Sequence, residues 1–247
     1  MRSNLFAPDH QETESAQPGL RLQNSKILKV ELAGECLARQ GSMVAYQGEI
    51  RFEAMGSGGL GNFLKQKLTG EGVPLMKITG RGDVFLADAA ADVHLIDLEG
   101  PQDALTINGK NVLAFESTLS YEIAMVSGAG SMSGAGLFNC VFRGQGRIAI
   151  TAKGAPVVLN VDQPTYADPQ AAIAWSAGLQ VGVHRAEQFG LGTLMGRSTG
   201  EAFTLGFGGQ GFVVVQPSEE LPVSAVSGTG GGQESGVGGM LGGFLGR

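Results

Sequence analysis

The side chains best suited to metal chemistry are the three histidines, His10, His94 and His184. A metal-binding barrel of the cupin type uses two histidines one residue apart, a glutamate and a distant third histidine. This chain has no His-x-His pair, and carboxylates such as Asp92 or Glu187 would have to complete a site around His94 and His184. We therefore expect no metal and no cofactor, and keep a metal or small-ligand site as the alternative.

The glycine-rich segments lack the residues that nucleophilic and phosphate chemistry need. A serine hydrolase places its nucleophile at the centre of Gly-x-Ser-x-Gly, but the nearest string, GSMSG from Gly130, has Met132 there. The same stretch lacks the lysine and hydroxyl of a phosphate-binding loop, and the Gly-x-Gly pairs elsewhere precede strand patterns where a dinucleotide site requires a helix. We expect no catalytic residues and interpret the protein as a non-enzyme.

The composition predicts an all-β fold able to bury a core. The chain has 247 residues, 43% of them hydrophobic, and its 41 glycines lie between short β-branched runs without a collagen period. Cys36 and Cys140 lie in hydrophobic runs and are too few for a disulfide scaffold, so we interpret them as small buried apolar groups.

Charge and hydropathy limit the surroundings in which the chain can act. A net charge of −6 with 6% aromatic residues argues against nucleic-acid binding, which needs a basic surface and rings for stacking. The first residues contain no continuous apolar signal segment, and no run approaches the roughly 18 apolar residues of a membrane-spanning helix. These features predict a cytoplasmic location.

One pattern occurs three times: a leucine-alanine or isoleucine-alanine pair with a turn and strand, then Gly-x-Gly with an alternating apolar strand. The first elements lie at Leu37, Leu113 and Ile173, and the glycine pairs are Gly80 and Gly82, Gly144 and Gly146, and Gly209 and Gly211. Such hairpins are too small to be stable alone, so three units should pack together.

This repeat predicts positions in the fold. Gly82, Gly146 and Gly211 should occupy equivalent turns or bulges, while Val84, Ile148 and Phe212 should face one core. The last strand, apolar on both sides, should be the most buried.

The ends of the chain differ from the middle in composition. Residues 1–19 are polar and contain prolines, and residues 218–247 are rich in Ser, Gly and Glu. Both segments are typical of flexible tails. The β domain with its three internal repeats is then expected over 20–217.

A segment inside the first unit, from Gly56 to Gly72, is a candidate interaction loop. It places apolar and cationic residues between two strands: Phe63, Leu64, Lys65 and Lys67. Exposed apolar residues on such a loop often form a contact surface. Two interpretations stay open, a contact surface and a cap of the chain's own barrel, and Asn62–Leu68 fits either a short helix or a hairpin tip.

The C-terminal tail carries an apolar stripe at helical spacing, Val237, Met240, Leu241, Phe244 and Leu245. Intervening glycines handicap that helix by about 1 kcal/mol each, so the tail should be disordered alone. Two interpretations stay open. The stripe folds on a partner groove or makes weak contact with a membrane surface, or the tail is a low-complexity segment with scattered apolar residues.

Several strings in this order resemble a known family. They are GSMVAYQG from Gly41, GSGGLGNFLKQKLTGEG from Gly56, ITGRGDVFLAD from Ile78 and LTINGKNVLAFESTLSYEI from Leu105. The chain resembles the altered inheritance of mitochondria protein 24 family from about Leu20 to Gln216, and more closely its bacterial members. The resemblance implies a fold like that of the tryptophan RNA-binding attenuation protein, with antiparallel β-sandwich units similar to a double-stranded β-helix. It brings no catalytic residues. Eukaryotic members are linked to mitochondrial inner-membrane organisation.

Two functions follow as competing hypotheses. The first is a non-enzymatic scaffold or interaction module that binds protein partners or forms a homo-oligomer. The second is a small-ligand or metal-binding β-barrel that uses the cavity of one unit.

Overall fold

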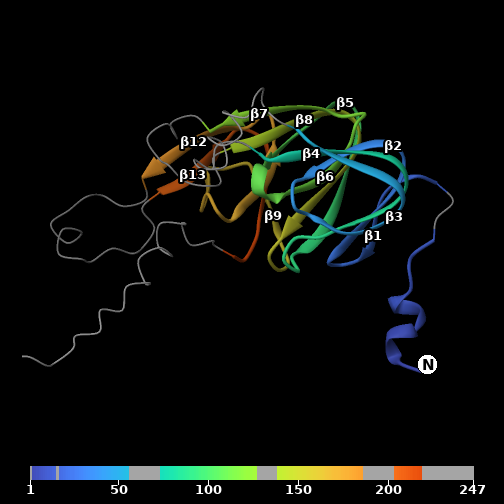
Figure 1. Cartoon of the computed structure of the whole chain (residues 1–247). Coiled ribbons are helices and arrows are strands. Elements are labelled where there is room, and N and C mark those ends of the chain that lie inside the picture. The colour runs from blue at the N-terminus through green and yellow to red at the C-terminus, as the bar shows by residue number, and fades with distance from the viewer. Residues whose placement is uncertain (1, 15–16, 56–72, 127–137, 186–202, 219–247) are drawn as a thin grey trace, which may run out of the picture.

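The structure, a computed structural model, describes residues 2–14, 17–55, 73–126, 138–185 and 203–218. Within these ranges it contains fourteen strands and three short 3₁₀ helices, and every strand pair is antiparallel (Figure 1). The predicted all-β class is therefore confirmed.

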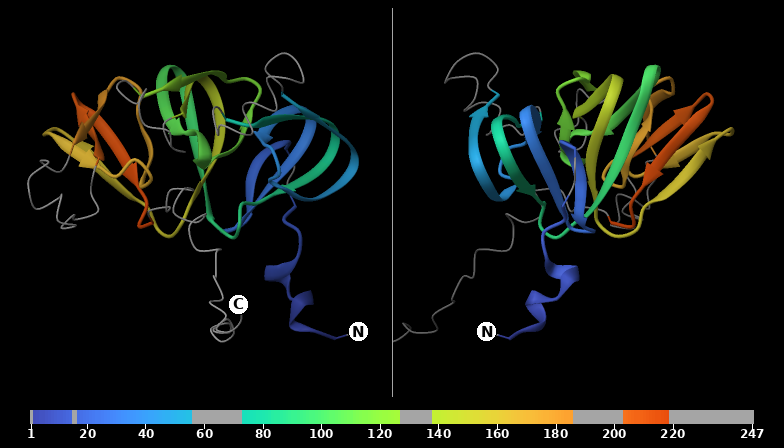
Figure 2. Two further views of the ribbon diagram at one scale, coloured as in Figure 1. Left: turned by 60° about the vertical axis from the view of Figure 1, so that its left-hand side comes forward. Right: turned by 90° about the vertical axis from the view of Figure 1, so that its right-hand side faces the viewer.

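The elements form three groups that lie side by side in chain order (Figure 2). The first contains η1 (Asn4–Phe6), η2 (Pro8–His10), β1 (Gly19–Asn24), β2 (Ile27–Arg39), β3 (Met43–Ala54) and β4 (Leu75–Leu86). The second contains β5 (Asp92–Asn108), η3 (Gly109–Asn111), β6 (Val112–Glu116), β7 (Ser120–Met125) and β8 (Phe138–Ala152). The third contains β9 (Val157–Val161), β10 (Thr165–Ala167), β11 (Ala172–Ser176), β12 (Gln180–Arg185), β13 (Phe203–Gly208) and β14 (Gly211–Val215).

Two sheets connect these strands. The larger runs in the order β3-β4-β2-β6-β8-β5-β11-β14-β9, with β1 added on β2 and β7 on β8. The smaller runs β10-β13-β12. No barrel closes among the described strands, which corrects the expectation of barrel units: the larger sheet is open, with β3 at one end and β9 at the other.

Glycines form the corner at which the first group folds over. Gly34 lies opposite Gly80, and Gly48 lies opposite Gly82, on three neighbouring strands. All four have positive φ, between +95° and +142°. A Cβ on Gly82 would overlap the carbonyl oxygen of Gln47, so only glycine fits this close approach of two backbones.

This corner brings the two ends of β4 together. Gln40 donates its backbone N–H to Pro74, just before β4, and Ser42 accepts one from Ala87, just after it. β2 ends beside the start of β4, and β3 begins beside its end. Because these two ends are close, three residues are enough to connect β2 to β3. The first group consequently wraps around a core to which β5, β6 and β8 of the second group also contribute.

The predicted turn glycines lie in two different settings. Gly82 and Gly146 lie inside the continuous strands β4 and β8 at positive φ, whereas Gly211 begins β14 after a turn at Gly209. Gly146 and Gly211 each leave room for a leucine, Leu119 and Leu179 respectively. The threefold repeat itself stays a prediction.

The expectation of one shared core is wrong. Val84 and Ile148 are fully buried, but Val84 belongs to the cluster of the first group and Ile148 to the central one. Phe212 is half-buried and packs against the central cluster. A third cluster around Trp175 and Phe207 fills the last group.

The last strand is also less buried than its sequence suggests. Only Val213 of β14 is buried. The strand lies next to the end of the larger sheet. Its neighbour on that side, β9, is the edge strand, and Val157 and Val158 of β9 are exposed. Apolar residues on both faces of a strand therefore do not require two covered faces.

Candidate functional site

Among the described strands of the first group, the edge strand β3 has the most exposed residues. Among the described strands it pairs only with β4, and every residue in it except Ile50 is exposed. Its register with β4 is uninterrupted from Ala45 to Ala54. One full side of its backbone thus faces away from the sheet.

Aromatic residues gather on one face of β3. The rings of Tyr46 and Phe52 meet edge to face with centroids 5.4 Å apart, and the residues are 49% and 37% exposed. Ile50 lies between them in the chain and packs against the core of the first group. These three residues, called here the β3 patch, expose an apolar surface beside an unpaired strand edge.

The opposite face of β3 is charged. Glu49 lies opposite Arg81 of β4, and Arg51 lies opposite Thr79. Together with Gly34 and Gly80 these side chains line a hollow of about 480 Å³ at the glycine corner. β3 therefore combines an apolar face with an ionic one, an alternation typical of half-buried strands.

Residues 11–13, inside the segment predicted to be flexible, make specific contacts with the first group. The Nζ of Lys29 donates to Oε1 of Glu12 at 2.6 Å and to the carbonyl of Thr13 at 2.8 Å, and lies 3.3 Å from Oδ2 of Asp83. Thr13 also donates its backbone N–H to Oε1 of Gln23. Beyond these contacts η1 and η2 project from the body as an arm (Figures 1 and 2).

The Lys29 side chain is only 3% exposed, so its charge needs these partners. Burial alone would lower the pKa of Lys29, but hydrogen bonds to Glu12 and Asp83 outweigh it and raise that pKa. The hydrogen bond from Lys29 lowers the pKa of Glu12. Burial and the neighbouring Glu12 raise the pKa of Asp83, the more distant carboxylate.

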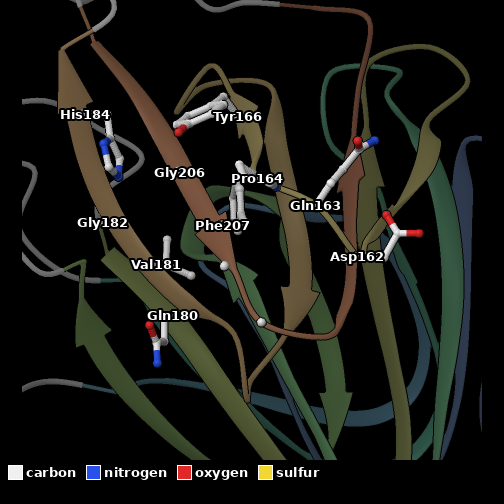
Figure 3. A pocket seen from close by; sticks show the side chains of 12 residues that line it. Asp162, Gln163, Pro164, Tyr166, Gln180, Val181, Gly182, His184, Gly206 and Phe207 are labelled. Carbon is white, nitrogen blue, oxygen red and sulfur yellow. The ribbon is translucent and has the colours of Figure 1, made fainter.

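A cavity of about 550 Å³ lies against the smaller sheet (Figure 3). Tyr166 of β10 and His184 of β12 lie across β13 with ring centroids 5.5 Å apart, edge to face. Gly206 of β13 makes room for both, because a Cβ there would overlap the His184 ring and approach Tyr166 at 3.1 Å. The other lining residues are Asp162, Gln163, Pro164, Gln180, Val181, Gly182, Phe207, Gly208 and Gly209.

This lining suits a small polar ligand with one apolar face. Tyr166 and His184 are exposed, Gly182 and Gly206 present a floor without side chains, and Asp162 and Gln180 supply polar atoms at the edge. Such a combination of rings and a few polar groups is typical of small-molecule sites.

Neither cysteine shows a reactive environment. Cys36 and Cys140 are free and buried, as predicted. Burial raises the pKa of each thiol to about 12. Nucleophilic thiols instead have lowered pKa values and access to solvent, so neither residue is set up as a nucleophile.

The histidines weighed as metal ligands lie in different sheets. His94 is in β5 of the larger sheet, whereas His184 is in β12 of the smaller one. Within the described ranges, no group of three or more His, Cys, Asp and Glu side chains is placed to hold a metal ion. The alternative of a metal or small-ligand site around His94 and His184 therefore stays a prediction, since Glu187 lies outside the described residues.

The interaction residues predicted from sequence lie outside the described residues. Phe63, Leu64, Lys65 and Lys67 fall within 56–72, and Met240, Leu241, Phe244 and Leu245 fall within 219–247. Both hypotheses about these segments stay predictions.

Comparison with known proteins identifies the family. The family model described as mitochondrial biogenesis AIM24 matches residues 20–218. The chain belongs to the AIM24 family. The resemblance stated from sequence motifs is thereby confirmed.

A solved structure shares the AIM24 chain's fold. Protein SPYM3_0169 from Streptococcus pyogenes superposes with a TM-score of 0.63 at 19% sequence identity, over 86% of this chain and 97% of that one. No protein with a curated description shows significant similarity. In the described part of this AIM24 chain, no helix is long and apolar enough to cross a membrane.

Sequence reasoning missed three features of this AIM24 chain: the β3 edge, the Lys29 cluster and the Tyr166–His184 pair. A signal existed only for the first. Residues 49–53, EIRFE, alternate charged and apolar residues as an amphipathic strand does, but the pattern does not tell an edge strand from a central one.

Proposed function

We propose that this AIM24-family protein is a non-enzymatic cytoplasmic scaffold that self-associates through the edge strand β3. The observation that carries the proposal is a strand of 12 residues whose backbone is unpaired on its outer side among the described residues. Proteins that stay monomeric usually shorten such edges or block them with proline. β3 is long, contains no proline and continues without a bulge from Ala45 to Ala54.

The side chains support the same conclusion. Tyr46 and Phe52 expose aromatic surface beside the edge, and aromatic residues are enriched in the centres of protein interfaces. A strand added to β3 would satisfy its outward N–H and C=O groups and cover these rings together. Both gains come from one contact.

Native mass spectrometry of the purified chain across a range of concentrations tests the proposal. We expect oligomers that dissociate on dilution. A single monomer peak at every concentration up to about 100 µM would contradict self-association, because interfaces of ordinary size have micromolar to picomolar dissociation constants.

The cavity at Tyr166 and His184 favours a second function, capture of a small polar molecule. Gentle purification followed by mass spectrometry of the denatured sample should then release a compound in molar ratio. The Tyr166→Ala variant should lose it, whereas Tyr46→Ala, a matched change at an exposed tyrosine on β3, should retain it. Equal yields from both variants would contradict a ligand at this cavity.

A further inference from the structure

The hydrogen bonding of β3 determines which of its residues face outward. Met55 donates its backbone N–H to Leu75 at 2.9 Å, which continues the register that places Ala54 opposite Met76. In an antiparallel ladder only alternate residues exchange hydrogen bonds with a given neighbour. From Ala45 to Ala54, odd-numbered residues of β3 therefore bond to β4, and the even-numbered ones, Ile50 among them, direct their N–H and C=O groups away from the sheet.

We infer that two copies of this chain pair β3 with β3, antiparallel about a twofold axis at Ile50, so that Glu49 of each copy lies opposite Arg51 of the other. The inference rests on the proposed function, since it specifies how self-association occurs. Ile50 is an outward-bonding residue and opposes itself on the axis. The positions on either side of it then carry opposite charges.

Charge complementarity is what selects this register. With the axis at Ile50, two Glu–Arg pairs form on the charged face, and Gln47 meets Glu53 next to them. Opposite charges directly across neighbouring strands are stabilising and like charges destabilising. On the other face, Phe52 of each copy comes opposite Gly48 of the other, where no side chain obstructs the ring.

A twofold axis at either neighbouring residue with outward-directed backbone groups, Gly48 or Phe52, gives poorer pairing of charges or a shorter paired segment. An axis at Gly48 places Gln47 opposite Glu49 and leaves Arg51 opposite Ala45. An axis at Phe52 pairs Arg51 with Glu53, but then only residues 50–54 stay within the strand. The axis at Ile50 keeps residues 46–54 paired and gives both charges a partner.

Charge reversal tests the register directly. Arg51→Glu and Glu49→Arg should each place like charges opposite one another and weaken self-association about tenfold or more. Mixing the two variants should restore it as a heterodimer, because one chain then presents an arginine at both positions and the other chain presents a glutamate at both. Native mass spectrometry separates the species by mass.

Glu122→Lys is the control, since Glu122 is exposed on β7, outside the proposed contact, and the change should alter the dissociation constant less than about threefold. Preferential heterodimers from the mixed variants would also show that both variants are folded. If wild type and single variants associate equally and mix randomly, the β3 register is wrong while self-association stands. If wild type is monomeric throughout, the proposed function itself fails.

Discussion

Tyr46 and Phe52 touch, with ring centroids 5.4 Å apart, although they lie six positions apart along one strand. Six residues of straight strand span roughly 20 Å. Because the two side chains together are too short for that span, β3 must bend toward this face, and Gly48, at φ +95°, lies between the two residues. The β3 patch is thus a product of the glycine corner.

The aromatic contact should be measurable as a coupling energy. Tyr46→Leu and Phe52→Leu should each destabilise the fold, and the double variant should lose less than their sum by about 0.5–1.5 kcal/mol, the range for edge-to-face pairs. Urea unfolding in the Arg51→Glu background excludes a contribution from self-association. Strict additivity would show that the rings touch without stabilising β3.

Gly82→Ala and Gly34→Ala form a matched pair at the corner. Both glycines have φ +142°, but a Cβ on Gly82 would overlap the carbonyl of Gln47, whereas nothing lies within 4 Å of one on Gly34. We expect Gly34→Ala to cost about 1–2 kcal/mol from backbone strain and Gly82→Ala at least about 2 kcal/mol more. Urea midpoints compare them. Equal losses would mean that strain alone explains both.

The glycines also show how far the sequence could predict this fold. Their pairing with apolar strands correctly indicated antiparallel β structure with backbone at positive φ. Gly82 was expected in a turn or bulge, and it lies inside a continuous strand at positive φ. What makes that strand bend is its close approach to Gly48, 34 positions earlier, and such a contact leaves no local signal.

Lys29→Met should release the N-terminal segment. The change removes the ammonium that joins Glu12 and Thr13 to Asp83, at a cost of about 2 kcal/mol. Hydrogen exchange at the Thr13 amide, which donates to Gln23, should accelerate. Lys26→Met is the control, because Lys26 forms a partly exposed pair with Asp92 away from Thr13; equal acceleration in both variants would contradict the anchor.

The same contact should depend on pH. Lys29 lowers the pKa of Glu12 in the folded chain, so the stabilisation is present above the unfolded value of about 4.3 and is lost as pH falls through the lower folded value. Exchange at Thr13, corrected for its intrinsic pH dependence, should thus be flat near neutrality and rise in acid. A Glu12→Gln variant that keeps the full rise would assign it to another group.

Cys36 and Cys140 should resist thiol reagents. With pKa values of about 12, only roughly one thiol in 10,000 is ionised at pH 8, and both side chains are buried. We expect almost no reaction with a chromogenic disulfide in native protein and two equivalents in urea. Rapid labelling of native protein would show that the strands around them open readily.

The candidate site was less predictable than the fold. β3 was visible as a strand in the sequence, but its place at the end of the sheet depends on which strands pair, and even its nearest partners, Ala54 and Met76, are 22 positions apart. Lys29 occupies an alternating run, LKVEL, in which a lysine ordinarily faces solvent. Its burial follows from acceptors supplied by a segment whose composition gave no sign of order.

The Lys29 ammonium also determines how the stability of the first group changes when residues are removed from the amino end: the loss is abrupt rather than gradual. Loss of residues through Gln11 removes the hydrogen bond from Gln23 to the Gln11 carbonyl but leaves Glu12 and Thr13 on Lys29. Loss of two more residues removes both acceptors and leaves Asp83, 3.3 Å away, as the remaining charged partner. Exopeptidase digestion up to residue 11 therefore mainly shortens the arm. Digestion past Glu12 removes partners of Lys29 and lowers the stability of the first group.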